Sequence, residues 1–454
     1  MSAGLDSTSD FMEIVRMPSA ETVFERLRPE IGQMPVIDSH EHTRSERERI
    51  EFPPGPEQLG YVGCDLCGAG AQWKESEAVE NAPDNQDAAR EVILKYWPYT
   101  RTTGYGRSIE RTLRGVFGIE QLNGETYGQL ASRLRDGITE GSYEHWFRDK
   151  YNIHAVVLDV DSDEDYSPLF FRSLRHAKYF VLCDSRAELE DLERRSGRSI
   201  HSAAQMRDAM WSYLERLIEE QPRVVALKNN LAYNRSIAFE RTTLAEADRA
   251  FNLLFADKFA RHADSWIAPH HRSYDELAAL QNFLVHESVR FAEEHDLVYQ
   301  IHTGLQAGYT NRISDSRPSH LVDLVSEYHR VKFVLFHGGF PWGREWGVLG
   351  RNFPNIYLDL CWMHIISPAT TVQMLDEWLD YVPSNKILGF GGDLKLVESI
   401  HGHLEIARDN IARTLARKVV RGDYDIPTAL EIARRMLFDN PNRVFGLGIE
   451  SPAS

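Results

Sequence analysis

Short apolar runs, rich in β-branched residues, recur along the chain and constrain its fold more than any other feature. They are nearly continuous rather than strictly alternating, which is typical of parallel strands buried on both faces. We predict strands at residues 34–38, 153–159, 178–184, 223–228, 297–302, 331–337, 355–360 and 386–390.

Amphipathic helical patterns fill the gaps between several of these runs. Residues 273–295 precede the fifth predicted strand, 320–330 the sixth and 370–382 the eighth. Strands that alternate with helices indicate βαβ units, and eight parallel strands are the number that closes a barrel. The sequence therefore predicts an α/β fold, a (β/α)₈ or TIM barrel.

Two intervals are longer than a plain connection between strand and helix requires. Residues 46–150 form a predicted helical insertion after the first strand, and a smaller insertion is expected at 233–272, after the fourth strand. We expect residues 1–33 to be an N-terminal segment and 34–454 to be the barrel with its insertions. Insertions after barrel strands lie at the C-terminal face, where they can cover a site.

Composition and net charge narrow the range of binding partners and cellular locations that we expect for the protein. The net charge of −17 disfavours nucleic acid, whereas local arginines can still bind a small anionic substrate. No apolar run is long enough to span a membrane. The first residues lack the pattern of a secretory signal, and four cysteines are too few for a disulfide scaffold, so we expect a cytoplasmic protein.

Histidines end three of the predicted strands. His40 and His42 close the first strand, and residues two apart on a strand point to the same side. His302 ends the fifth strand and His337 the sixth. Neutral imidazoles suit a borderline divalent ion, so we predict a metal site with zinc, or alternatively manganese, iron or nickel.

Two further strand ends carry ionisable groups that could take part in catalysis. Asp393 follows two glycines after the eighth strand, where a carboxylate could bind the metal, accept a proton from its water, or do both. Lys228 ends the fourth strand. As a carbamate it could bridge two metal ions; as an amine it could bind a substrate carboxylate or form an ion pair with Asp159 or Glu41. The sequence leaves open whether one ion or two are bound.

Candidate substrate-binding residues lie in the segments that follow the strands. Arginine and tyrosine side chains could hold a carboxylate, and aromatic side chains could line the pocket. The candidates are Arg111 in the first insertion, Tyr233 and Arg235 after the fourth strand, Trp342 in the loop 338–346, Trp362 after the seventh strand, and His401. His401 and His403 are expected on the helix after Asp393, where we expect only His401 to reach a substrate.

The motif Asp38-Ser39-His40-Glu41-His42, together with His302, His337 and Asp393, resembles the metal ligands of the amidohydrolase superfamily. The resemblance implies that these side chains surround one or two divalent ions, and that the protein is a homo-oligomer. The C-terminal third is similar to uronate isomerases, which move a proton between adjacent carbons of an open-chain sugar acid. In those enzymes the aspartate is followed by a serine and an arginine that help hold the substrate; here Leu394 and Lys395 follow Asp393.

The predicted site is compatible with more than one reaction. Our main hypothesis is hydrolysis of a small amide, lactone or related carboxylate-bearing compound, with Asp393 as proton acceptor and His337 as a ligand or as a stabiliser of the oxyanion. The alternative hypothesis is isomerisation or non-oxidative decarboxylation at the same metal. A barrel without activity, serving only as a binding module, is a third hypothesis, and the intact ligand set counts against it.

Overall fold

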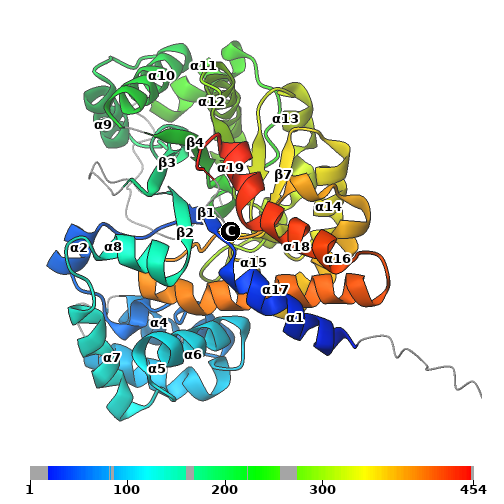
Figure 1. The fold of residues 1–454 in the computed structure, drawn as a ribbon. Helices are drawn as coiled ribbons and strands as arrows, with labels where there is room; N and C mark the ends of the chain where they lie inside the picture. Colours follow the sequence, from blue (N-terminus) through cyan, green and yellow to red (C-terminus); the bar gives the residue numbers. More distant parts are fainter. Residues whose placement is uncertain are drawn as a thin grey trace, which may run out of the picture.

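The protein was analysed as a computed structural model, which describes residues 19–80, 82, 86–159, 168–221, 223–255 and 273–450. Eight parallel strands form one sheet in the order β1-β2-β3-β4-β5-β6-β7-β8, with helices around it (Figure 1). The strands are β1 (Val36–Glu41), β2 (Ile153–Leu158), β3 (Phe170–Arg175), β4 (Val224–Asn229), β5 (Val298–Ile301), β6 (Phe333–Leu335), β7 (Ile356–Asp359) and β8 (Ile387–Leu388). The predicted barrel is confirmed.

One predicted strand is wrong. Residues 178–184 were expected to form the third strand, but Ala177–Val181 is a π-helical segment and β3 precedes it. Arg172 and Ser173 interrupt the apolar pattern of β3. Its backbone nevertheless pairs with a strand on either side, Val156 opposite Phe170 and Leu227 opposite Leu174. Pairing across the sheet therefore outweighs the local composition of this segment.

The barrel closes between the end of β8 and the end of β1. The Ser39 amide donates to the Phe390 carbonyl over 3.1 Å, and the Asp393 amide donates to the His40 carbonyl over 2.9 Å. The His42 amide donates in turn to the Leu394 carbonyl. These bonds leave the two chain segments side by side at the C-terminal end of the barrel.

Helices surround the barrel, and their apolar faces form a continuous core with the strands. A second cluster joins strand residues to the C-terminal helix α19. The helices that follow β2 are α9 (Arg186–Ser196), α10 (Ala203–Glu220), α11 (Leu244–Phe255), α12 (Ser273–Glu294), α13 (Val322–Glu327), α14 (Gly343–Asn352), α15 (Met363–Ile366), α16 (Pro368–Tyr381), α17 (Val397–Val420), α18 (Ile426–Arg434) and α19 (Asn440–Phe445).

Helices also fill the segment between β1 and β2. They form a lobe at one side of the barrel, against α17 (Figure 1, blue to cyan), with an apolar core of its own that Leu396 joins. Its helices are α2 (Glu46–Glu51), α3 (Cys64–Gly68), α4 (Trp73–Glu80), α5 (Gln86–Thr100), α6 (Gly104–Phe117), α7 (Gly124–Asp136) and α8 (Ser142–Glu144). The lobe thus stands beside the end of the barrel at which β1 and β8 meet.

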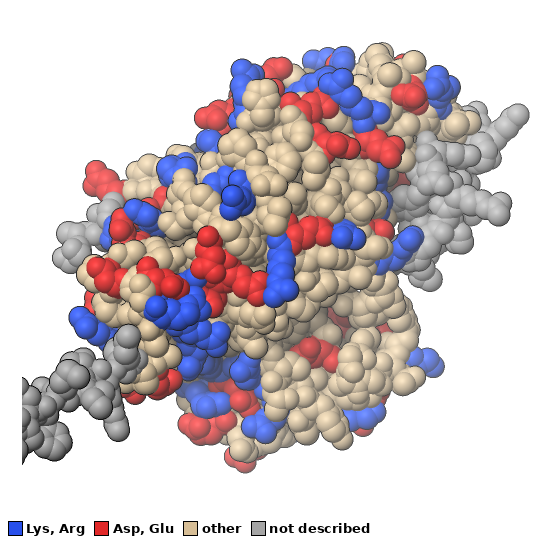
Figure 2. Space-filling model, turned by 90° about the vertical axis from the view of Figure 1, so that its right-hand side faces the viewer, with Lys and Arg blue, Asp and Glu red and all other residues tan. Residues whose placement is uncertain are grey.

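The N-terminal helix α1 (Ala20–Gln33) packs along α17. Residues 1–18 of the predicted N-terminal segment lie outside the described residues, as do residues 256–272 of the predicted second insertion. Acidic and basic side chains are interspersed on the face drawn in Figure 2, so the acidic chain does not present a uniformly negative surface there. Among the described helices, none combines the length and apolar character that crossing a membrane requires.

A buried ion pair ties the lobe to the barrel. Arg49 on α2 donates to both carboxylate oxygens of Glu398 on α17, over 3.2 and 2.8 Å, and both side chains are at most 1% exposed. Removing one partner leaves the other charge buried without compensation, which costs about 3–5 kcal/mol.

We therefore expect Glu398→Ala to lower the free energy of unfolding by about 3–5 kcal/mol in urea denaturation followed by tryptophan fluorescence. Asp191→Ala, which removes an exposed partner of Arg194 and Arg195, serves as the control and should cost below about 1 kcal/mol. Equal losses in the two variants would contradict a structural role for the buried pair.

Candidate metal centre and cleft

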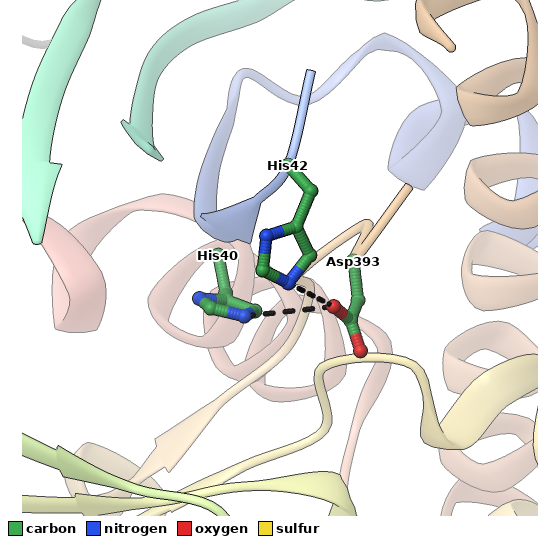
Figure 3. A group of neighbouring side chains, drawn as sticks. All are labelled: His40, His42 and Asp393. Atoms are coloured by element: carbon green, nitrogen blue, oxygen red, sulfur yellow. Dashed lines mark ion pairs between the residues drawn. The ribbon is translucent and has the colours of Figure 1, made fainter. Parts of the chain in front are cut away.

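Three predicted metal ligands meet where β1 and β8 join. His40 and His42 come from the end of β1, and Asp393 from the loop after β8 (Figure 3). The Nε2 atom of His42 lies 3.0 Å from Asp393 Oδ1, and that of His40 lies 3.5 Å from the same oxygen. The candidate ligand atoms of these three residues all lie within 4.8 Å of one another. Their side chains therefore converge on one point.

The charges of this group suit a divalent cation. Burial, and then the neighbouring Lys228, hold the pKa of His40 well below its ordinary value, so its imidazole is neutral. Burial acts to raise the pKa of Asp393, but the hydrogen bond from His42 and the charges of the histidines outweigh it and keep that pKa well below its usual range. Two imidazoles and one ionised carboxylate are a ligand set that zinc and similar ions accept.

His302 and His337 lie beside this group with opposed ring nitrogens. His302 Nε2 donates to the Leu305 carbonyl and His337 Nδ1 to the Cys361 carbonyl. Burial lowers the pKa of His302 far below its usual value and that of His337 to about 4, so both rings are neutral. Each ring then has its lone pair on the remaining nitrogen.

Those nitrogens, His302 Nδ1 and His337 Nε2, lie only 3.0 Å apart. Two lone pairs at this distance repel each other unless a proton or a cation lies between or beside them. His337 Nε2 is also 4.0 Å from Asp393 Oδ2, which links this pair of rings to the first group of ligands. The donor set therefore fits the divalent ion that the sequence predicts.

The loops after β6 and β8 hold two of these ligands in an uncommon backbone conformation. His337 has φ of 63° and Asp393 has φ of 55°, in the left-handed region that non-glycine residues seldom adopt. Such residues are found mainly at functional sites, where the surrounding structure holds them in place. His403 on α17 helps to do so, since its Nδ1 donates to the carbonyl of Gly392.

Lys228 on β4 is buried at the bottom of the site. Its Nζ atom donates to His40 Nε2 over 3.3 Å and lies 3.7 Å from the centre of the Phe336 ring. In the described part of the chain it forms no ion pair, either with Asp159 or with Glu41. Burial lowers the pKa of its ammonium group. Lys228 is therefore adjacent to the predicted ligands.

An open cleft of about 1030 Å³ leads to this group. Its walls come from the helical lobe and from the loops after β2, β3, β4, β5 and β8. The lining residues include His42, Arg44, Glu48, Glu57, Tyr61, Cys64, Glu80, Asp159, Arg175, Tyr233, Tyr309, Asp393 and Lys395. The cleft is large enough for a small-molecule substrate and carries charges of both signs.

Asp159 and Arg175 are cleft residues that the sequence did not single out as site residues. Asp159 follows β2, and its Oδ2 lies 3.8 Å from His40 Nε2. Arg175 ends β3 and donates through Nε to Asp159 Oδ1 over 2.6 Å. Asp159 could have been identified from the sequence, because it lies at the end of a predicted strand. Arg175 could not, because the third strand was predicted at residues 178–184, after the true position of β3.

Tyr61, Arg44 and Lys395 were also missed. The Tyr61 hydroxyl donates to the backbone carbonyl of Asp393, and its ring stacks 5.2 Å from Tyr105 and 4.8 Å from Trp362. Lys395 lines the cleft two residues after Asp393. Of these three residues, only Lys395 could have been identified from the sequence, because it lies two positions after the predicted ligand Asp393.

Two of the predicted substrate-binding residues lie at or beside the cleft. The Tyr233 ring lies 4.5 Å from the His302 ring, and its hydroxyl accepts a hydrogen bond from the Ala307 amide. Trp362 is buried, with its ring 5.1 Å from that of His337. Trp362 thus packs against one of the predicted ligands and does not line the open cleft.

The structure does not bring the other four candidates to the cleft. Arg111 on α6 binds Asp409 on the outer side of α17, and Arg235 binds Gln281 on α12. Trp342 is the N-cap residue of α14 and is absent from the cleft wall. His401 packs against Tyr151 and α6. Of the two histidines on α17, it is thus His403 and not His401 that contacts the loop carrying Asp393.

Comparison with known proteins relates the chain to one family. The family model described as amidohydrolase matches residues 214–447, which is more than half of the chain. Protein fluG of Emericella nidulans is 28% identical over 239 residues, covering 51% of this chain and 27% of that protein. The uronate isomerase of Cutibacterium acnes is 23% identical over 240 residues, covering 49% of this chain and 51% of that protein. The matched part thus spans about a quarter of the length of protein fluG and about half of the length of the uronate isomerase.

The fold is also that of a solved enzyme. The glucuronate isomerase of Caulobacter crescentus superposes with a TM-score of 0.74 at 16% identity, and the alignment covers 96% of each chain. The likeness includes the helical lobe as well as the barrel, since so little of either chain is left out.

Loss of a ligand should remove the metal. We expect purified protein to contain a bound divalent ion by inductively coupled plasma mass spectrometry, and His42→Ala or Asp393→Asn to reduce its content strongly, because the first variant deletes a donor atom and the second removes the negative charge of the group. His401→Ala is the matched control, since His401 lies outside the group. A His42→Ala protein with the metal content of the wild type would refute the assignment.

Proposed function

The chain belongs to the amidohydrolase family, and from this we propose that it is a metal-dependent isomerase of an open-chain sugar acid. The observation that carries the proposal is a cation, Lys395, that forms no ion pair among the described residues and lies in the wall of the cleft that holds the predicted ligands. Similarity to uronate isomerases, in sequence and along nearly the whole fold, favours isomerisation over the hydrolysis of an amide or lactone.

His40, His42 and Asp393 would hold the ion, with His302 and His337 beside them. Zinc suits these donors, and manganese, iron or nickel could occupy them. When bound, a divalent ion polarises carbonyl and hydroxyl oxygens of a substrate as a Lewis acid.

Lys395 is placed to bind the substrate carboxylate. Within the described residues it forms no ion pair, whereas Arg175 is engaged by Asp159 and Arg44 by Glu48. It occupies the position, two residues after the aspartate, at which uronate isomerases carry an arginine. A lysine provides the same positive charge without the planar fork of an arginine, so it fixes the orientation of a carboxylate less tightly.

Asp159 is placed to move the proton. Arg175 holds Oδ1, while Oδ2 faces His40 Nε2 at 3.8 Å and His42 Nε2 at 4.0 Å. In the reaction that we propose, the Asp159 carboxylate takes the proton from C2 of the aldehyde and returns a proton to C1. The hydroxyl proton of O2 passes to O1 as the carbonyl moves from C1 to C2 and a hydroxyl group forms at C1, so no atom is gained or lost overall.

The partners and location remain those expected from the sequence: a small carboxylate-bearing substrate, neither nucleic acid nor membrane, a homo-oligomer and a cytoplasmic protein. The cations in the cleft support the first of these proposals, and the net charge of −17 supports the absence of nucleic acid as a partner.

The reaction can be followed by NMR in D₂O with glucuronate and galacturonate as substrates. We expect conversion to the corresponding 2-ketose sugar acid, with solvent deuterium at C1 of the product, because the transferred proton exchanges with solvent on the Asp159 carboxylate. Release of carbon dioxide, or hydrolysis of amides and lactones without any isomerisation of sugar acids, would overturn the proposal.

Two variants separate the proposed roles. Asp159→Asn should retain its metal but lose deuterium incorporation, since an amide cannot accept the proton.

Lys395→Met should raise KM about tenfold or more with a smaller effect on kcat, because a charged hydrogen bond to the substrate contributes about 1.5–3 kcal/mol. Lys395→Arg, which keeps the charge, is the control. An unchanged KM for Lys395→Met would exclude the role assigned to this lysine.

A further inference from the structure

A second hollow of about 390 Å³ lies apart from the cleft, where α6 and α16 flank α17. It shares no lining residue with the cleft. Its lining residues are Arg107 and Arg111 from α6, Pro368, Ala369 and Val372 from α16, and Ile406, Asp409, Asn410, Arg413 and Arg417 from α17. We call it the arginine groove.

The groove concentrates positive charge in an acidic protein. Four arginines face one aspartate, in a chain whose net charge is −17. On each of α6 and α17 the two arginines are four residues apart and therefore adjacent on the helix surface, an arrangement that is destabilising by itself. With Asp409 as its one acidic side chain, the groove keeps an excess of positive charge that a bound anion would offset.

The charges in the groove are incompletely paired within the protein. Asp409 already accepts hydrogen bonds from Arg28 and Arg111, at 2.6 and 2.8 Å. Arg413 approaches Glu21 only to 3.8 Å. Within the part of the chain that the structure describes, Arg107 and Arg417 form no ion pair. Two guanidinium groups are thus available to a ligand, whereas that of Arg413 also lies 4.3 Å from the centre of the Phe24 ring.

The floor of the groove is apolar. Val372 and Ile406 are 5% and 4% exposed, and Pro368 lies beside them. Asn410 is also buried there, with its amide nitrogen engaged by His364 on α15. An apolar floor beneath a rim of guanidinium groups matches a molecule that combines a flat apolar part with an anionic group.

We propose that the arginine groove binds a phosphate-bearing small molecule of the nucleoside phosphate class. Guanidinium groups bind phosphoryl oxygens through paired hydrogen bonds and also stack on planar rings. Arg107 and Arg417 bind the phosphates, and the ring system rests on Val372 and Ile406. This site is separate from the proposed isomerase site and does not depend on that proposal.

Isothermal titration calorimetry with ADP, pyrophosphate and adenosine tests the proposal on the full-length protein. We expect saturable binding of ADP, weaker binding of pyrophosphate, and weaker binding still of adenosine, which lacks the charges. The double variant Arg107→Gln/Arg417→Gln should bind ADP at least about tenfold more weakly, since each charged hydrogen bond to a phosphate is of that magnitude.

Arg114→Gln is the matched control, because Arg114 lies on the same helix outside the groove and pairs with Glu110. It should bind ADP as the wild type does, whereas the loss of affinity in the double variant distinguishes the groove from ADP bound at the metal. Absence of saturable binding by ADP and pyrophosphate, or equal affinity in the double variant and the wild type, would overturn the proposal. So would a change in the oligomeric mass of the double variant by light scattering, since the groove would then be an interface between copies.

Discussion

The junction between the first and last strands determines where the candidate metal ligands lie. Two buried carboxyl groups hold it together, beyond the backbone bonds that close the barrel. Asp38 Oδ1 accepts hydrogen bonds from the amides of His40 and Gly392, and Glu41 Oε2 accepts one from the amide of Leu394 over 2.8 Å. Burial raises the pKa of Asp38 to about 7 and that of Glu41 well above its usual value.

The close approach at this junction explains its glycines. A side chain on Gly392 would place a Cβ atom 1.7 Å from Glu41 Oε1, so no other residue fits without displacing the carboxyl group. The next residue in the chain is Asp393, whose side chain consequently lies beside those of His40 and His42. The ligand geometry is therefore a consequence of barrel closure.

The strand ends supply the chemistry, and the inserted helices supply much of the wall around it. Tyr61, Cys64 and Glu80 belong to the helical lobe, whereas Asp159 and Lys395 follow barrel strands and Arg175 ends one. In such barrels the catalytic groups stand at the C-terminal ends of strands, and variation of the connecting segments changes the substrate. An acidic chain can thus present separate local cations to anions in the cleft and in the arginine groove.

The sequence predicted the barrel and the candidate ligands at its strand ends because both depend on local patterns. An apolar run followed by His40, His302 or His337 identifies a strand end, and parallel strands end at one face. The third strand was misplaced because β3 is identified by its pairing with neighbours rather than by its composition. Similarly, the roles of Arg111 and His401 depend on the phase of a helix and on distant partners, Asp409 and Tyr151, which no local pattern reveals.

The central claim is that these strand ends form one metal centre. X-ray diffraction from crystals of the protein grown with zinc, recorded on either side of the zinc absorption edge, tests it most directly. The account predicts an anomalous peak about 2.0–2.2 Å from the Nε2 atoms of His40 and His42 and from a carboxylate oxygen of Asp393. A peak elsewhere, or zinc-saturated crystals with no peak between these three side chains, would contradict it.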